Sequence, residues 1–235
     1  MYRHWREVFY PAKLPQSKWL EFYTRHFSTV ELNNSFYRLP TEKAFASWRE
    51  TSPAGFVYAV KVSRFITHIK RLKDVDEPVD TFLSRARLLE EKLGPLLYQL
   101  PPNMHRNDER LDAFLSLLPG GLRHVVEFRH DSWLNDTVFA ILRRHNVGLC
   151  VFDMPDLSCP LLATADFAYV RFHGATGLYY SRYSDDELED WARRIAELAG
   201  DLEAVYIYFN NDAEGYAIEN ARTLRQRLIC ATGPE

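Results

Sequence analysis

The sequence is poor in cysteine, with three among 235 residues. Cys150, Cys159 and Cys230 are scattered and show no Cys-x-x-Cys spacing, so they fit neither a disulfide framework nor a zinc site. No run approaches the roughly twenty apolar residues that cross a bilayer, and the N-terminus has no apolar core of a signal peptide. We therefore expect a cytoplasmic protein with reduced thiols and no membrane contact.

Strong charge of one sign is also lacking. The net charge of -3, with 26% charged residues, neither favours nor excludes a polyanionic partner, so any charge argument must be local. There is no Gly/Ser linker, low-complexity tract or sequence repeat. With 46% hydrophobic residues the chain can bury one large core. We predict a single domain over residues 1–235, and nothing in the sequence indicates an obligate protein partner.

Strand-like runs recur along the chain, and helical patterns separate most of them. The seven runs are 29–36, 57–66, 95–101, 124–130, 147–153, 167–174 and 204–211. Helical spacing is clearest at Trp19-Tyr23-Phe27, Phe82-Ala86-Leu89-Leu93, Leu188-Trp191-Ile195-Leu198 and Ala221-Leu224-Leu228, with stops at Gly94, Asn146 and Gly200. Residues 154–166 contain two prolines, which predicts an irregular connection there. The alternation indicates a parallel sheet of the α/β class.

Polar residues end several of these strands in one phase. Side chains alternate faces along a strand, so Glu127 lies with Arg129, Arg171 with His173, and Tyr208 with Asn210. The same alternation adds Glu31, Asn33, Lys61, Ser63, Gln99 and Asp153 to this face. Polar groups gathered at the C-terminal ends of parallel strands are typical of the mouth of a TIM-type (β/α) barrel, where barrel enzymes carry their sites.

Two interpretations of these residues stay open. Glu31, Glu127 and Arg171 lie deep in the predicted barrel, where a satisfied ion-pair network that only holds the sheet together is as good an explanation as a functional role. His173 and Asn210 lie nearer the rim, where packing needs polar groups less and function is favoured.

Positive charge is concentrated at the same predicted mouth. The segment 61–73 contains Lys61, Arg64, His68, Lys70, Arg71 and Lys73, and Arg38, Arg129, His130, Arg171, His173 and Arg182 fall nearby. An anionic ligand is the natural inference, although Lys70, Arg71 and Lys73 fit a solvated loop better. The loops 173–177 and 210–215 are rich in small residues whose backbone N–H groups can approach a phosphate. The aromatic residues Tyr37, Trp133, Tyr179, Tyr180 and Tyr183 either stack on a base or sugar or serve packing.

These residue types suggest acid–base chemistry on a bound anion. Arg129 and Arg171 would hold the anion, His173 would be the general acid or base, and Glu127 or Asp153 would orient it. The remaining ligand-binding candidates are Asn33, Arg38, Lys61, Gln99, His130, Gly174, Tyr208, Asn210 and Asn211. A divalent metal held by Glu31, Glu127, Asp153 and His173 is an alternative that the neighbouring cations disfavour, so we predict no metal and no cofactor. A glycosidase pair, Glu31 with Glu127, is disfavoured by the same cations.

Several motifs in order carry a resemblance to a known family. They are Tyr2-Arg3-His4-Trp5-Arg6, Thr29 to Arg38, Tyr98-Gln99-Leu100-Pro101-Pro102, Glu127-Phe128-Arg129-His130, Tyr169 to Gly174 and Phe209-Asn210-Asn211. The chain resembles the YecE-like family, domain of unknown function 72. The resemblance implies a TIM-type barrel distantly similar to sugar isomerases and apurinic-site endonucleases.

The start of the chain departs from the family pattern. Members usually have a first strand ending in a Gly-Thr-Ser-Gly-like run before the tyrosine that is Tyr2 here, and this sequence has only Met1 there. We expect a TIM-type barrel that lacks its first strand and has seven visible strands. Either the start is misplaced and the real protein is longer, or the barrel is open or distorted.

The sequence thus predicts a protein that binds a phosphate-bearing ligand, either a nucleotide or nucleic acid. Whether it also hydrolyses a phosphoester bond is left open. A non-catalytic anion-binding module and a carbohydrate-active enzyme are the alternatives.

Overall fold

The computed structural model describes residues 3–232, and its strands follow the predicted order. The chain forms two compact units, one built from residues 15–148 and the other from the remaining parts of the chain. The first unit contains β1 (Thr29–Leu32), β2 (Val57–Lys61), β3 (Leu93–Gln99) and β4 (His124–Glu127), each paired in parallel with the next. The second contains β5 (Gly148–Asp153) from Leu149 onward, β6 (Phe167–Phe172) and β7 (Ala204–Phe209), also parallel.

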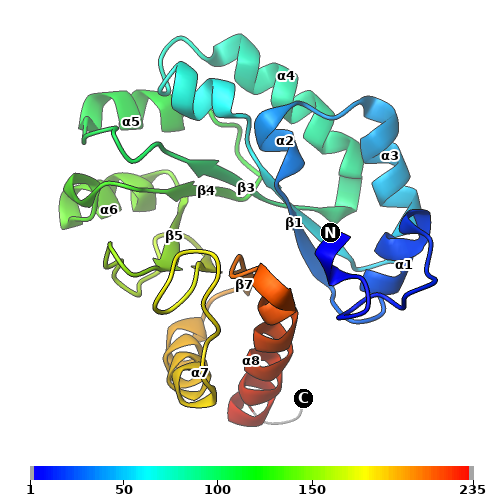
Figure 1. Ribbon diagram of the computed structural model, residues 1–235. Helices are drawn as coiled ribbons and strands as arrows, with labels where there is room; N and C mark the ends of the chain where they lie inside the picture. Colours follow the sequence, from blue (N-terminus) through cyan, green and yellow to red (C-terminus); the bar gives the residue numbers. More distant parts are fainter. Residues whose placement is uncertain (1–2, 233–235) are drawn as a thin grey trace. The chain divides into compact units, whose positions relative to one another are not determined.

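Helices separate most of the strands, as Figure 1 shows. They are α1 (Trp19–Tyr23), α2 (Asn34–Tyr37), α3 (Glu42–Thr51), α4 (Asp76–Ala86), α5 (Asp108–Ser116), α6 (Asp136–Arg144), α7 (Asp185–Ala199) and α8 (Tyr216–Thr232). A π-helix spans Phe65–Ile69, and 3₁₀ turns span Arg3–Trp5, Gln16–Lys18, Arg87–Lys92, Asp131–Trp133 and Ala213–Gly215. Parallel strands alternating with helices in chain order are the pattern of the TIM-type fold. The predicted α/β class and the seven strands are confirmed, whereas the single domain stays a prediction.

Local sequence signals explain where α3, α5, α6 and α7 begin. The side chains of Thr41, Asn107 and Asn135 accept hydrogen bonds from the first turns of α3, α5 and α6. Ser184 and Glu187 form the reciprocal capping box of α7. Between β5 and β6 the residues 154–166 contain no helix, as the two prolines predict.

Several predicted boundaries are wrong. The first strand ends at Leu32, and Asn34–Tyr37 form helix α2 instead of continuing it. The second strand, predicted over 57–66, ends at Lys61, and Phe65–Ile69 form a π-helix. Gly94 was predicted to end a helix, but it lies inside β3. A glycine is required there because a Cβ would lie 2.4 Å from Val57 Cγ1 on β2. The register between β2 and β3 shifts close to this contact, between Tyr58 and Val60, so the glycine serves a close approach of two strands.

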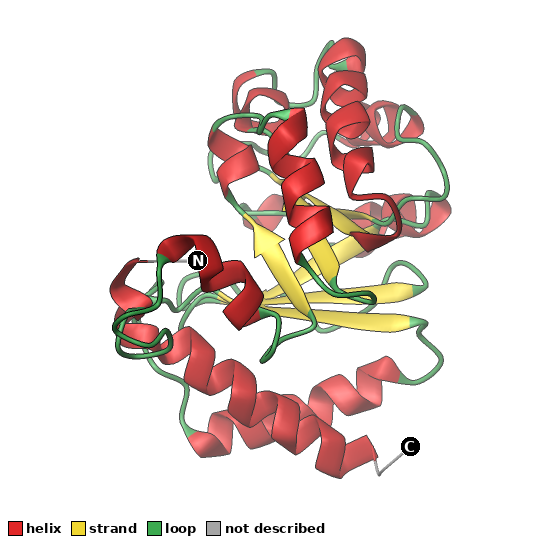
Figure 2. Cartoon of the chain, turned by 90° about the vertical axis from the view of Figure 1, so that its right-hand side faces the viewer, coloured by secondary structure: helices red, strands yellow, loops and turns green. Residues whose placement is uncertain are grey.

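The core lies between the strands and the helices that cover them. In the second unit Val151, Val170 and Phe172 pack against Trp191 of α7 and Leu224 of α8, and the two helices lie side by side (Figures 1 and 2).

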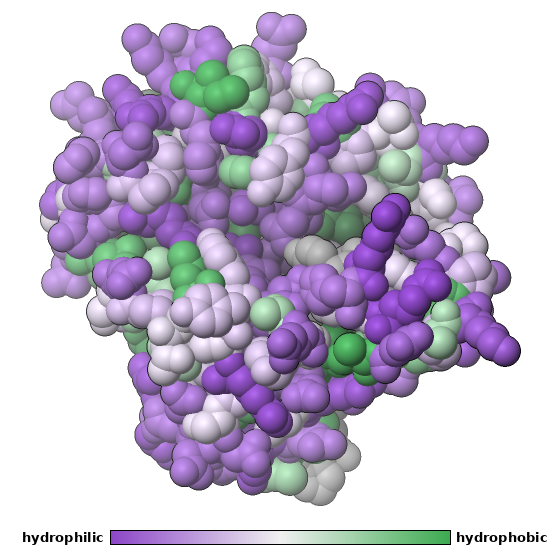
Figure 3. Space-filling view, viewed as in Figure 1, coloured by the Kyte–Doolittle hydropathy of each residue, from purple (hydrophilic) through white to green (hydrophobic). Residues whose placement is uncertain are grey.

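In Figure 3 hydrophilic residues cover most of the face in view, and hydrophobic ones form only separate small patches. None of the helices within residues 3–232 combines the length and the apolarity that crossing a membrane requires.

Candidate anion-binding site

A chain of polar side chains joins the C-terminal ends of β2, β3 and β4. Lys61 pairs with Leu97 and Gln99 with Glu127 in the sheet register, so all these residues share one face. Lys61 Nζ donates to Gln99 Oε1 at 3.0 Å, and Gln99 Nε2 donates to Glu127 Oε1 at 3.0 Å. Arg129 Nε also donates to Glu127 Oε1 and forms an ion pair with it. The structure therefore brings four predicted site residues into direct contact.

The π-helix after β2 places a histidine beside this chain. Lys61 Nζ lies 4.1 Å from the centre of the Phe36 ring, and the edge of the same ring faces His68 at 5.0 Å between centroids. Burial, followed by four neighbouring cations, lowers the pKa of His68 from 6.5 to about 4. In decreasing order of effect these are Lys61, Arg64, Arg71 and Arg129. We call Lys61, Arg64, His68, Arg71 and Arg129 the cationic cluster.

The segment that carries part of the cluster has an unusual backbone. Phe65–Ile69 is a single π-helical turn, and the following Arg71, Leu72 and Asp74 have φ of 50°, 66° and 51°. Such turns and left-handed residues occur often where function requires them. Arg71 donates to Asn103 Oδ1 at 3.0 Å. Arg64 is exposed and, among the described residues, makes no ion pair or side-chain hydrogen bond, so its guanidinium is available to a ligand.

Other predicted residues of this unit lie nearby or serve the fold. Glu31 pairs with Ala59 in the register, on the same face as Lys61, and Asn33 directly precedes α2. Arg38 is exposed. His130 Nδ1 accepts from the backbone N–H of Ser132 at 3.2 Å, so this side chain caps a 3₁₀ turn.

The second unit holds the other predicted residues. Arg171 pairs with Tyr208 in the register and is buried, and Asn210 donates its backbone N–H to Phe172 O at 2.7 Å. His173 is fully buried, and the ring of Tyr179 meets its ring edge-on at 5.5 Å between centroids. The ligand-binding and acid–base roles of these residues stay predictions.

The loop after β6 uses its backbone groups internally. Gly174 has a φ of 111°, and a Cβ there would lie 2.2 Å from Gly177 O. Ser181 Oγ accepts from the backbone N–H groups of Thr176 and Gly177 at 3.0 Å each. These amides are therefore directed into the loop and not to an anion, which contradicts the phosphate cradle predicted here.

Polar side chains hold this loop in place. Asn211 Nδ2 donates to Ser181 O at 3.0 Å and to Asn220 Oδ1 at 2.8 Å. Asn220 Nδ2 in turn donates to Tyr183 O at 3.0 Å. The buried Asn211 thus connects the loop after β6 with α8.

The predicted orientation of Asp153 is wrong. Asp153 pairs with Phe172, which packs among the helix-facing residues of the second unit, whereas Phe152 pairs with Arg171. The carboxyl group hydrogen-bonds to Tyr183, and burial raises its pKa although that hydrogen bond opposes the change. Asp153 therefore does not share the face of Arg171.

The predicted rim aromatics divide into two kinds. Trp133 and Tyr183 are buried, and Trp133 stacks on Phe128 at 5.0 Å between centroids, so both serve packing. Tyr37 and Tyr180 are 73% and 65% exposed and remain able to stack on a ligand.

One polar group was missed by the sequence analysis. Trp5 Nε1 donates to Asp212 Oδ1 at 2.8 Å, and His4 Nε2 lies 3.7 Å from Asp212 Oδ2. Burial raises the pKa of Asp212 to about 6, although His4 and Trp5 lower it. No local pattern signals this contact, because about 200 residues of sequence separate its partners.

Among residues 3–232, no three His, Cys, Asp or Glu side chains gather closely enough to hold a metal ion.

Comparison with known proteins gives one family and several relatives. Residues 1–233 match the family described as "Protein of unknown function DUF72". The UPF0759 protein YunF of Bacillus subtilis is 27% identical over 253 aligned residues, which cover 93% of this chain and 89% of that protein. The UPF0759 protein YecE of Escherichia coli is 37% identical over 112 residues, which cover 47% of this chain and 41% of YecE.

Solved structures agree with this fold. The crystal structure of a DUF72 family protein from Thermotoga maritima, 30% identical, matches with a TM-score of 0.88 over 97% of this chain and 95% of that one. A DUF72 family protein from Enterococcus faecalis, 21% identical, matches with a TM-score of 0.81 over 89% of this chain and 87% of that one.

Proposed function

The chain belongs to the DUF72 family, and we propose that it binds a phosphate-bearing ligand at the ends of its strands. The ligand is either a nucleotide or nucleic acid. The cationic cluster at the ends of β2 to β4 is the observation that supports the proposal. Four of its five side chains are lysine or arginine, residue types that carry positive charge. Such a concentration of positive charge is local in a protein of net charge -3, and it favours an anionic ligand at this place.

Within the cluster, Arg64 is the cation that favours binding of an external anion, whereas Glu127 is the internal anion of the site. Its Oε1 already accepts from Gln99 and Arg129. Lys61 is directed toward Gln99, and Arg64 makes no ion pair among the described residues. A phosphate group carries up to two negative charges and several acceptor oxygens. The guanidinium group of an arginine can bind it with two parallel hydrogen bonds.

Hydrolysis of the ligand is a further part of the proposal. Release of inorganic phosphate from a nucleotide by the wild type would support it, and a His173→Ala variant would test whether the predicted acid–base residue takes part. The carbohydrate-active alternative needs Glu127 as a free carboxylate, and its contacts with Gln99 and Arg129 disfavour that role. A cytoplasmic location is proposed as well, on the scattered cysteines.

Binding of two probes over a salt series tests the proposal. Ribose 5-phosphate presents a phosphate without a base, and a single-stranded oligonucleotide presents many phosphates. We expect both to bind, with an affinity for the oligonucleotide that falls as salt rises. Arg64→Gln should weaken both affinities by roughly tenfold, which corresponds to about 1.4 kcal/mol.

Arg87→Gln is the matched control. It also removes one positive charge from the same unit, but Arg87 precedes β3 and so lies at the opposite end of the strands from Arg64. Its affinities should equal those of the wild type. Failure of both probes to bind, or equal losses in the two variants, would overturn the proposal.

A further inference from the structure

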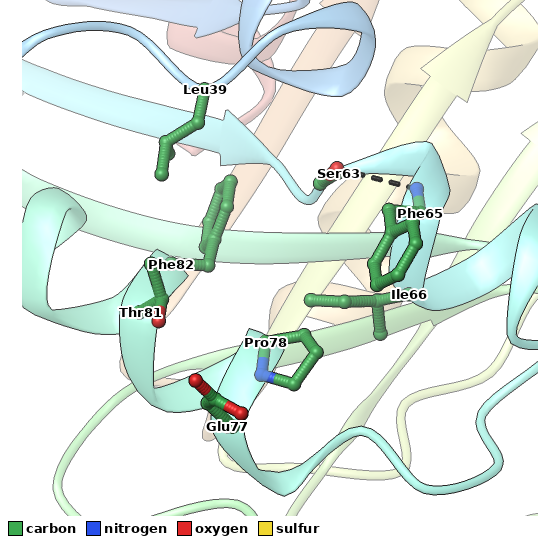
Figure 4. Close-up of a pocket in the computed structure, with 8 residues that line it drawn as sticks. All are labelled: Leu39, Ser63, Phe65, Ile66, Glu77, Pro78, Thr81 and Phe82. Atoms are coloured by element: carbon green, nitrogen blue, oxygen red, sulfur yellow. Dashed lines mark hydrogen bonds between the residues drawn. The ribbon is translucent and has the colours of Figure 1, made fainter.

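An apolar hollow opens beside the cationic cluster. Its volume is about 250 Å³, and Leu39, Phe65, Ile66, Pro78 and Phe82 supply its apolar lining (Figure 4). The lining comes from three segments of the same unit: the chain after α2, the π-helix after β2, and the first turns of α4. Glu77 and Thr81 of α4 add a carboxylate and a hydroxyl to the lining, and both residues are exposed.

The hollow and the cationic cluster share one wall. Phe65 and Ile66 line the hollow, while Arg64 and His68, from the same short segment, belong to the cluster. Lys70 Nζ lies 6.0 Å from the centroid of the Phe65 ring. A molecule with an anionic end and an apolar end therefore matches the two surfaces at once.

We propose that the hollow receives the base of a mononucleotide whose phosphate is held by the cationic cluster. This inference rests on the proposed function and names its ligand class. The Phe65 ring is 42% exposed and offers a flat face on which a base stacks.

The polar residues of the hollow favour a base over an alkyl chain. The Glu77 carboxylate repels a phosphate group and accepts a hydrogen bond from an exocyclic amine, such as that of adenine. The Thr81 hydroxyl both donates and accepts, as the edge of a base requires. An alkyl chain would use neither group.

Comparison of adenosine 5′-monophosphate with ribose 5-phosphate tests the base contact, because the two differ only in the base. We expect the nucleotide to bind at least tenfold more tightly to the wild type. Thr81→Trp fills the hollow from an exposed helix position, so the chain should still fold, and it should bring the two affinities to within about twofold of each other.

Ser84→Trp is the control, since Ser84 is exposed on α4 and does not line the hollow. This variant should keep the preference for the nucleotide. Equal affinities of the two ligands for the wild type, or a preference that survives Thr81→Trp, would overturn the inference while leaving the proposed function intact. Failure of both ribose 5-phosphate and the single-stranded oligonucleotide to bind would overturn the proposed function.

Discussion

The side-chain amide of Gln99 donates a 3.0 Å hydrogen bond to the carboxylate of Glu127, its neighbour across the β3–β4 pair. The oxygen of the same amide accepts from Lys61. Gln99 thereby connects a cation on β2 with a buried carboxylate on β4. Glu127 acts as a fixed counter-charge within the site, and the cations around it are held at the strand ends.

The ion pair of Glu127 and Arg129 should contribute strongly to stability. Glu127 is fully buried and Arg129 nearly so, and removal of one partner from such a pair costs about 3 kcal/mol or more. We expect Arg129→Ala to lower the free energy of unfolding by about 3 kcal/mol, measured by urea denaturation. Adding Glu127→Gln should recover part of the loss, because the uncompensated charge disappears. A loss below about 1 kcal/mol, the range of exposed pairs, would show that the pair is not buried in solution.

Gly174 should tolerate no side chain. Its φ of 111° is unfavourable for other residues, and the Cβ of an alanine would lie 2.2 Å from Gly177 O, so the loop after β6 would have to shift. We expect Gly174→Ala to destabilise the fold by about 1–3 kcal/mol in thermal or urea unfolding. Gly120→Ala is the control, because a Cβ at Gly120 meets no atom within 4 Å. Equal stability of the two variants would contradict this description of the loop.

Asp212 should make stability depend on pH in an unusual direction. Its pKa is raised by burial from 3.8 to about 6, so between these values the folded chain binds more protons than the unfolded chain. The stabilisation is therefore fully present below pH 3.8 and is lost as pH rises through about 6.

Asp212→Asn removes this titration while keeping an oxygen for Trp5 Nε1. Urea unfolding should show that the variant gains stability relative to the wild type between about pH 4 and pH 7. Asp201→Asn, at an exposed position, is the control and should not change the pH profile. Parallel pH profiles for the wild type and Asp212→Asn would contradict the raised pKa.

The sequence was sufficient to predict the face of some strands but not of others. In β4 and the residues after it, Val126 and Phe128 alternate with Glu127 and Arg129, so the inward face could be identified. In β5 both faces are apolar, with Leu149 and Val151 on one and Cys150 and Phe152 on the other. Alternation cannot orient such a strand, and Asp153 was placed on the wrong face.

Contacts between distant segments were the other limit. Gly94 resembles a helix stop in the sequence, and only the approach of Val57 from β2 explains why a glycine lies inside β3. A loop aromatic such as Trp133 has the same local pattern whether it packs inside or faces solvent. The concentration of charge in segment 61–73 was visible in the sequence, but the neighbours of His68 were not.

An NMR titration of His68 is the most direct test of the central claim, that the cationic cluster binds a phosphate group. A His68→Gln variant assigns its signal among those of the eight histidines. Burial and four cations hold the pKa of His68 near 4, and a bound phosphate would offset these charges. Ribose 5-phosphate at saturation is therefore predicted to raise the pKa of His68 and, by linkage, to bind more tightly as the pH falls. A His68 pKa and chemical shift that stay unchanged by the ligand would contradict the account.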